Sequence, residues 1–327
     1  MRIRHLLAAT LLAFAIQAQA AAAQAPHREH LTIRTEHFAI HFTRELEPLA
    51  RHAAVQAERA YAALAQELVP PRGTIDLVVS DNVDYANGYA TTAPTNRIVV
   101  YAHPPIDSPA LRYNSDWMQL VITHELAHVF HLDRSRGMWR GLQYVFGRNP
   151  LLFPNNYSPR WLSEGLATYY ESRLTGEGRV KGSFHRELAL ASAREGTLPR
   201  LDEVSVATPV FPGGQSVYVY GSLFLDHLAR TRGADKVRAV VERTAVHPFP
   251  FILNRVSRHA FGVSYRDAWR EFTDSLDRAA GSYAAPFNGW RDLTPASLAA
   301  EFLRWNADGT LTYTGTAPRE RYGAVPV

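Results

Sequence analysis

The sequence predicts an α+β fold, in which a small mixed α/β lobe is followed by a mainly α-helical lobe. Short alternating apolar runs and one long alanine-rich segment fill residues 26–115, which predicts strands and a helix. Apolar residues at helical spacing dominate residues 116–282. With 327 residues, 46% of them hydrophobic, the chain is long enough to bury a sizeable core.

The first 25 residues are expected to be a signal peptide and to be removed from the mature protein. Arg2 and Arg4 precede an apolar run at 6–16, and small residues with two A-x-A cleavage sites follow it. This is the layout of a secretory signal, and the run is too short to span a bilayer. No later stretch reaches the roughly 18 apolar residues of a membrane helix. We therefore expect a periplasmic or secreted protein without a transmembrane segment after signal removal.

Charge and cysteine content narrow the function. The chain has 35 basic and 31 acidic residues and a formal net charge of +4. Its arginines are scattered, whereas a nucleic-acid-binding protein gathers them in a patch or stripe. It contains no cysteine, so a metal site has to be built from His, Asp and Glu.

The N-terminal lobe is predicted over residues 26–115. Apolar runs predict strands at 38–42, 75–79 and 97–102, and the segment 46–68 predicts a helix that Pro70 and Pro71 stop. Between the second and third strands, residues 81–96 are polar and rich in turn formers.

The helical lobe is predicted over residues 116–282, and its first helix is capped by Asp116. The predicted helices span 116–131, 159–173, 183–195, 216–231, 234–244 and 265–280. The aromatic-rich segment 137–157 separates the first two and is too long for a simple connector. It fits a functional or partner-facing loop as well as an insertion packed on the core. The tail, 283–327, holds a predicted hairpin around Asp308-Gly309.

The run HELAH at 124–128 is the first chemical signal. Residues four apart lie on one face of a helix, so His124 and His128 point at one spot, with Glu125 beside them. Two neutral imidazoles can hold zinc, and a neighbouring carboxylate can take a proton from the water that zinc activates. Without a third ligand the pattern also fits a hydrogen-bonded structural pair of histidines.

A zinc site needs a third protein ligand, and the run WLSEGLATYYE at 161–171 supplies the best candidate. It places Glu164 in an apolar helix, where a carboxylate requires a cation or a proton as partner. Two residues nearer in sequence fit less well. His131 is on the same predicted helix as His128 but on a different face of it, and Asp133 falls at the end of that helix.

Together, HELAH and WLSEGLATYYE resemble the motifs of the gluzincin metallopeptidases, specifically the bacterial peptidase MA-like domains related to the M1 and thermolysin superfamily. The resemblance implies a thermolysin-like arrangement with zinc in the cleft between the lobes. It also implies a role for each matching residue: zinc ligation by His124, His128 and Glu164, general base catalysis by Glu125, and orientation of a ligand histidine by Glu171 or instead by Thr168.

These families also use a tyrosine on a later helix to stabilise an oxyanion. The pattern Y-x-x-G-x-x-F at 218–224 resembles that helix, so Tyr218 is the predicted donor and Tyr220 the reserve. A tyrosine at this place fits a packing role in the core equally well.

Two departures from the aminopeptidase pattern refine the expected activity. The aromatic insertion lengthens the gap between His128 and Glu164, and residues 88–100 lack the acidic side chain that binds a substrate amine. An endopeptidase or a narrow-specificity enzyme is therefore expected, with the strand at 97–102 as the sheet edge that pairs with an extended peptide.

The expected function is that of an exported zinc metallopeptidase acting on peptides or proteins. One alternative is a catalytically idle zinc-binding module that serves as an envelope scaffold or binds an envelope partner, and another is a zinc hydrolase that acts on a non-peptide amide. The presence of Glu125 favours the enzyme, because an idle domain has no need of a base. Residues 304–313, RWNADGTLTY, resemble the start of a TolB-type β-propeller blade, so the chain is also a candidate N-terminal part of a propeller protein.

Overall fold

A computed structural model of the chain describes residues 29–106, 108–206, 212–249, 251–282 and 299–316. The predicted signal peptide lies outside the described residues. The chain divides into two compact units, the first ending at Ala280 and the second beginning at Gly281. The fold is a mixed α/β one, with a sheet and many helices, as the sequence predicts in outline.

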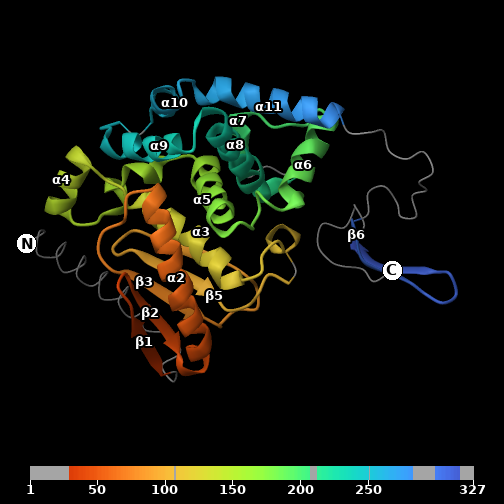
Figure 1. The fold of residues 1–327 in the computed structure, drawn as a ribbon, viewed down its shortest axis with the longest axis horizontal. Helices are drawn as coiled ribbons and strands as arrows, with labels where there is room; N and C mark the ends of the chain where they lie inside the picture. Colours follow the sequence, from red (N-terminus) through yellow and green to blue (C-terminus); the bar gives the residue numbers. More distant parts are fainter. Residues whose placement is uncertain (1–28, 107, 207–211, 250, 283–298, 317–327) are drawn as a thin grey trace, which may run out of the picture. The chain divides into compact units, whose positions relative to one another are not determined.

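A five-stranded sheet forms the N-terminal part of the first unit (Figure 1). In spatial order its strands are β1 (His30–Arg34), β2 (Phe38–Thr43), β3 (Ile75–Ser80), β5 (Arg97–Tyr101) and β4 (Gly88–Thr91). The three middle strands are parallel, and the two outer strands pair antiparallel to their neighbours. The three strands predicted from the sequence correspond to β2, β3 and β5 and are confirmed.

The prediction that the strand at 97–102 is the sheet edge is wrong. Strand β5 lies between β3 and β4, so β4 is the edge. Four residues, Gly-Tyr-Ala-Thr, make up β4, and they lie inside a stretch that reads as polar and turn-rich. Because cross-strand pairing to β5 stabilises it, local sequence does not reveal it.

One face of the sheet is buried and the other carries polar side chains. On β3, Ile75, Leu77 and Val79 are buried, while Asp76 and Ser80 on the opposite face are partly exposed. Helix α2 (Glu47–Glu67) packs against β2 and β3, and α3 (Trp117–Leu132) packs against β4 and β5. The core of the N-terminal part therefore lies between the sheet and these two helices.

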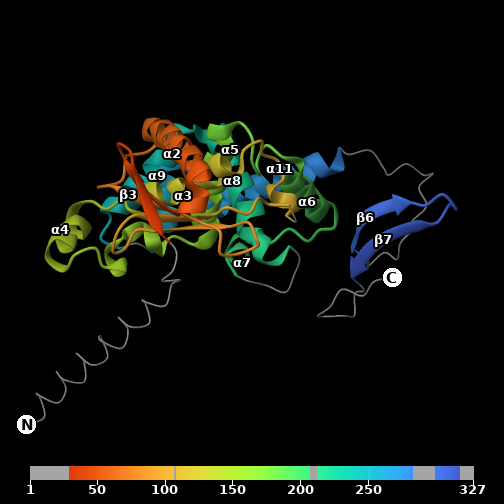
Figure 2. The ribbon, with the colours of Figure 1, turned by 90° about the horizontal axis from the view of Figure 1, so that it is seen from below.

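The rest of the first unit is helical (Figures 1 and 2). After α3 the helices are α4 (Gly137–Phe146), α5 (Arg160–Thr175), α6 (Ser183–Arg194), α7 (Leu201–Val204), α8 (Ser216–Arg232), α9 (Asp235–Val246), α10 (Leu253–Phe261) and α11 (Tyr265–Gly281). Both views place α4 and α6 at opposite sides of this unit. None of the described helices combines the length and apolarity that a membrane span requires.

The insertion at 137–157 contains regular structure, namely α4 and two short 3-10 helices, Pro150–Leu152 and Pro154–Tyr157. Its aromatic residues divide into two groups. Trp139 and Phe153 are buried, whereas Tyr144 and Phe146 are exposed. The segment thus packs on the core in part, as one interpretation predicts, while a functional or partner-facing role stays a prediction.

Helices α5 and α8 cross with their backbones in contact. A Cβ atom on Gly165 would lie 2.5 Å from the carbonyl carbon of Gly221, and one on Gly221 would lie 2.3 Å from the carbonyl oxygen of Trp161. Only glycine permits this approach. The two helices that carry Glu164 and Tyr218 are therefore held close together.

In the second unit, β6 (Ala299–Trp305) and β7 (Leu311–Thr316) pair antiparallel around the predicted Asp308-Gly309 turn. Asn306 donates its side-chain N–H to both Thr310 and Thr312, which ties the two strands together near the turn. The hairpin itself is confirmed, and its resemblance to a propeller blade stays a prediction.

Candidate metal centre

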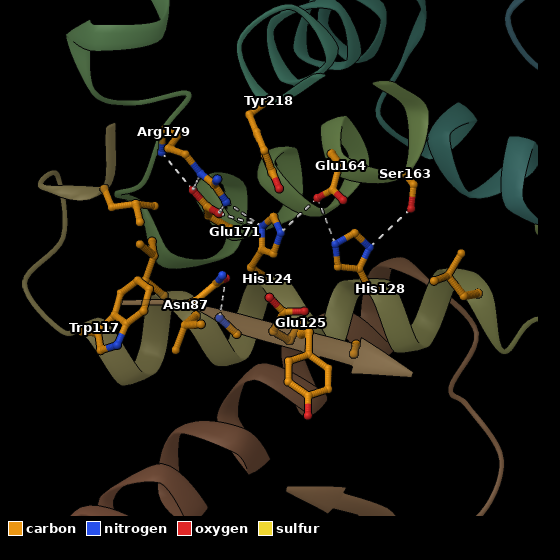
Figure 3. Close-up of a pocket in the computed structure, with 17 residues that line it drawn as sticks. Asn87, Trp117, His124, Glu125, His128, Ser163, Glu164, Glu171, Arg179 and Tyr218 are labelled. Atoms are coloured by element: carbon orange, nitrogen blue, oxygen red, sulfur yellow. Dashed lines mark hydrogen bonds and ion pairs between the residues drawn. The ribbon is translucent and has the colours of Figure 1, made fainter. Parts of the chain in front are cut away.

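Helix α3 sets the spacing of the HELAH side chains. The side chain of Asp116 caps the helix by accepting a hydrogen bond from the backbone N–H of Gln119 at 3.2 Å, as predicted. The helix is buried along most of its length. His124, Glu125 and His128 are therefore all buried; the two histidine rings point toward α5 and α8, and the Glu125 carboxylate lies beside them, close to β4 (Figure 3).

Helix α5 brings Glu164 to the two histidines. Its Oε2 atom lies 3.6 Å from Nε2 of His124 and 3.3 Å from Nε2 of His128. One donor atom from each residue falls within 4.8 Å of the others. Two imidazole nitrogens and one carboxylate oxygen form the donor set of a three-ligand zinc site, so these residues fit such an ion.

The two nearer alternatives for the third ligand lie elsewhere. Asp133 is bound by the guanidinium groups of Arg72 and Arg148, at 3.2 and 2.8 Å. His131 is buried, and burial together with the charge of His128 lowers the pKa of His131 to about 3. His131 is not part of the group of converging donor atoms.

Glu171 lies directly behind His124. Its Oε2 atom is 2.9 Å from Nδ1 of His124, on the opposite side of the ring from Glu164 (Figure 3). A carboxylate in this place fixes the tautomer and the orientation of a ligand histidine. Thr168, the other predicted residue, is fully buried, and its hydroxyl has no hydrogen-bond partner among the described residues.

A functional candidate that the sequence does not reveal is Arg179, in the turn between α5 and α6. The run Gly-Glu-Gly-Arg reads as a flexible loop, yet only 9% of the Arg179 side chain is exposed. Its guanidinium donates to both carboxylate oxygens of Glu171, at 3.0 Å from Nε and 2.5 Å from Nη2. The signal in the sequence is weak, since it amounts to one arginine after a glycine, downstream of a buried glutamate.

Electrostatic effects in the centre favour charged carboxylates around His124. Burial and Arg179 lower the pKa of His124, but hydrogen bonds to Glu164 and Glu171 outweigh them and raise it to about 9. Burial raises the pKa of Glu164 and Glu171, but hydrogen bonds and charges from the histidines and Arg179 outweigh it and leave both well below the ordinary range. For Glu125, burial is the largest effect and raises the pKa.

Tyr218 lines the same cavity, whereas Tyr220 does not. The half-buried ring of Tyr218 lies 6.4 Å from that of His124, and its hydroxyl points toward the metal centre (Figure 3). The guanidinium carbon of Arg179 lies 4.9 Å from the centre of the Tyr218 ring. Tyr220 is buried and donates its hydroxyl to Ser192 at 2.8 Å, so it is a core residue.

The centre opens into a cavity of about 260 Å³. Strand β4 forms one wall, through Gly88, Tyr89 and Ala90. A Cβ atom on Gly88 would lie 3.2 Å from Oε1 of Glu125, which shows how closely this edge strand approaches the predicted base. The cavity thus joins a sheet edge, a carboxylate and the converging histidines.

A scan against protein-family models finds no match, and a search of curated proteins finds none either. Among solved structures the chain is similar to an M1 zinc metallopeptidase from Deinococcus radiodurans, with 17% identity, a TM-score of 0.45, and coverage of 79% of this chain and 53% of that one. It is also similar to yeast LTA4 hydrolase, with 16% identity, a TM-score of 0.41, and coverage of 78% and 38%. A third similar structure is that of a functionally unknown conserved protein from Bacillus anthracis str. Ames, with 12% identity, a TM-score of 0.38, and coverage of 78% of this chain and 53% of that one.

The chain spans about half the length of the first of these proteins. At such identities and TM-scores the similarity carries no conclusion about activity. The function proposed below rests on the metal centre of this chain.

Proposed function

We propose that the chain is an exported zinc metallopeptidase of the gluzincin type, which hydrolyses peptide bonds. One observation carries this proposal: two buried imidazoles and a carboxylate converge on one point, and a further buried carboxylate, that of Glu125, lies beside them. A structural pair of histidines would not need Glu164 opposite both Nε2 atoms.

His124, His128 and Glu164 would hold the zinc ion. Bound there, zinc would supply a Lewis acid that polarises a substrate carbonyl and acidifies water. Glu171 accepts the hydrogen bond from Nδ1 of His124 and so keeps Nε2 free to act as a ligand. On His128, the hydroxyl of Ser163 lies 3.5 Å from Nδ1 and occupies the corresponding place.

Glu125 acts as the general base. Its carboxylate takes a proton from the attacking water and passes it to the nitrogen of the leaving amine. Because burial raises its pKa, this carboxylate is a stronger base than an exposed glutamate, as proton transfer near neutral pH requires. Tyr218 donates its hydroxyl hydrogen to the carbonyl oxygen as negative charge develops there.

The free edge of β4 is the proposed binding surface for the substrate backbone. In the β4–β5 ladder the N–H of Tyr101 donates to the carbonyl of Asn87, so alternate residues from Asn87 onward point their polar backbone groups at β5. The backbone groups of Gly88 and Ala90 therefore point outward. The N–H of Gly88 donates to Oδ1 of Asn87 at 2.8 Å, so the carbonyl of Gly88 and both backbone groups of Ala90 are the ones proposed to pair with an extended peptide. An edge of this kind binds a chain from within its length, which favours an endopeptidase.

Export is proposed from the sequence of the first 25 residues, and the substrates would be peptides or proteins of the periplasm or the exterior.

A specific observation supports a second candidate function, that of a zinc-binding module that is catalytically idle and binds an envelope partner. The insertion presents a group of exposed apolar side chains, Tyr144, Val145, Phe146 and Leu151. Such a patch is typical of a surface that meets another protein.

The test measures zinc content and cleavage of an unstructured protein, such as casein, in the parent, Glu125→Gln and Glu164→Ala. We expect Glu125→Gln to keep zinc and lose at least about 100-fold in rate, because the base is gone. Glu164→Ala should lose both zinc and activity. Glu58→Gln, a partly buried carboxylate bound to His37, is the control and should change neither. Zinc without cleavage in the parent would support the idle module, and failure to bind zinc would overturn both candidates.

A further inference from the structure

Arg179 is buried in the metal centre, although the proposed mechanism gives it no part. Taking a guanidinium out of water is unfavourable unless its charge and its hydrogen bonds are satisfied. The surroundings of Arg179 satisfy them from two sides, and each side belongs to a different functional group.

The first side is Glu171. The backbone N–H and Nε of Arg179 both donate to Oε1 of Glu171 at 3.0 Å, and Nη2 donates to Oε2 at 2.5 Å. Nη2 also lies 2.8 Å from Nδ1 of His124. Arg179 therefore holds the carboxylate that orients His124, and it leaves that carboxylate little freedom to rotate.

The second side is the ring of Tyr218, whose centre lies 4.9 Å from the guanidinium carbon. The crossing of α5 and α8 fixes the backbone of Tyr218 but not the torsions of its side chain. A cation stacked on the ring face supplies that restraint, since it is attracted to the π electrons of the ring. Figure 3 shows the guanidinium of Arg179 at the carboxylate of Glu171, with Tyr218 beside it.

We propose that Arg179 is a positioning residue that couples the two halves of the catalytic site, because one guanidinium holds both the carboxylate behind His124 and the ring of Tyr218. The inference rests on the proposed function. Arg179 also lines the cavity, but we assign its effect on the reaction to the hydroxyl of Tyr218, which the experiment below separates from a direct contact.

Arg179→Lys separates the positioning role from a role of charge alone. Lysine keeps a positive charge, but it has no planar group to bind Glu171 through two nitrogens while it stacks on a ring. The matched control is Arg148→Lys. Arg148 also binds a buried carboxylate, that of Asp133 at 2.8 Å, and lies over an aromatic ring, that of Phe153 at 5.1 Å, but it is outside the metal centre.

The experiment combines each arginine variant with Tyr218→Phe and measures zinc content, kcat and KM. We expect Arg179→Lys to keep zinc and to lose about 10- to 100-fold in kcat with little change in KM, since a misplaced catalytic group costs this much. In the Tyr218→Phe background the same change should cost less than about three-fold, because no hydroxyl is left to position. Arg148→Lys should have the same effect in both backgrounds.

Two results would overturn the proposal: equal losses of kcat for Arg179→Lys in both backgrounds, or a loss of activity that follows a loss of zinc. If Arg179→Lys does not fold, Arg179→Gln replaces it, because it can still donate one hydrogen bond to Glu171. Crystal structures of the zinc-loaded parent and variant provide a readout that needs no activity. A Tyr218 ring that stays in place in the variant would refute positioning even if the parent proves to be inactive, and a displaced ring would support it.

Discussion

Two turns of this molecule share one arrangement, a glycine followed by an arginine that binds a carboxylate and lies over an aromatic ring, but the surroundings of the two arginines differ. Gly147 and Gly178 both have a positive φ, 70° and 81°, and each directly precedes an arginine, Arg148, which is partly buried, and Arg179, which is buried. Arg148 binds Asp133 and lies over Phe153, while Arg179 binds Glu171 and lies over Tyr218. Of these two clusters, that of Arg148 lies in the turn after α4, and that of Arg179 lies in the turn before α6. The helices α4 and α6 lie at opposite sides of the first unit (Figure 2).

The clusters differ in what else the arginine touches. Arg148 donates to the backbone carbonyls of Thr92 and Pro94 and to the side chain of Asn96, so it ties the insertion to the β4–β5 connection. Arg179 instead contacts His124 and Tyr218. A glycine with a positive φ thus places an arginine against a carboxylate and an aromatic ring in both turns. The two arginines differ in the other groups that they contact.

The largest expected effect is the loss of the carboxylate in each cluster. Glu171→Ala leaves Arg179, whose side chain is 9% exposed, without a counter-charge, and should lower the free energy of unfolding by about 3–5 kcal/mol. Asp133→Ala leaves Arg148 and Arg72, which are 24% and 28% exposed and reach water, so about 1–3 kcal/mol is expected. Urea denaturation with a chelator present measures both. Equal losses would mean that the two clusters are energetically alike.

Zinc affinity should separate the clusters more cleanly, though by a smaller free energy. Glu171→Gln removes the charge behind His124 and should weaken zinc binding by about 10- to 100-fold. Asp133→Asn touches no ligand and should leave the dissociation constant within about three-fold. Competition against a chromophoric chelator gives both values. A weaker dissociation constant in Asp133→Asn would show that the insertion supports the metal centre.

The burial of His185 near Arg179 should affect the acid stability of the protein. Burial and Arg179 lower the pKa of fully buried His185 to about 3, against about 6.5 in the unfolded chain. Below pH 6.5 the unfolded state binds a proton that the folded state does not. His185 therefore costs about 1.4 kcal/mol of stability per pH unit as the pH falls from 6.5 toward 3.

His185→Leu should remove this contribution between pH 6 and 4, as denaturation at several pH values would show. His259→Leu, at an exposed position, is the control and should leave the slope unchanged. If the slope persists in His185→Leu, then His185 is already protonated in the folded protein or does not set the acid limb.

The smallest effect distinguishes the two glycines. Alanine is strained at both positions, at about 1–3 kcal/mol. At Gly178 its Cβ would also lie 2.9 Å from Cγ and Oε1 of Glu171, whereas at Gly147 it would meet nothing within 4 Å. We expect Gly178→Ala to cost roughly 1 kcal/mol more, measured by thermal unfolding. Gly141→Ala, inside α4, should instead be neutral or slightly stabilising. A larger loss at Gly147 would reverse the predicted order.

The features that could be predicted from the sequence are those that depend on the spacing of residues within one helix or strand. His124 and His128 are brought together by helical spacing alone, and the apolar surroundings of Glu164 mark it as a residue that needs a partner. The strands β2, β3 and β5 follow from their alternation. The same reasoning finds α5 and α8, although it cannot say that they cross at Gly165 and Gly221.

What the sequence hides depends on contacts between distant segments. Strand β4 exists because it pairs with β5, and Arg179 matters because Glu171 and Tyr218 reach it from two helices. Helix α10 is not predicted, because its nine residues are too few to show a clear helical repeat of apolar positions. The sheet edge cannot be found from the sequence either, because the order of the strands depends on contacts between distant segments.

The crossing of α5 and α8 also bears on how the site could move. Two helices in backbone contact have no side-chain layer that could slide or repack between them, so Glu164 and Tyr218 should travel together as one rigid body. Opening of the cavity would then have to come from its other wall, the short edge strand β4. Motion at this cavity is therefore expected in the edge strand β4, while α5 and α8 keep their relative positions.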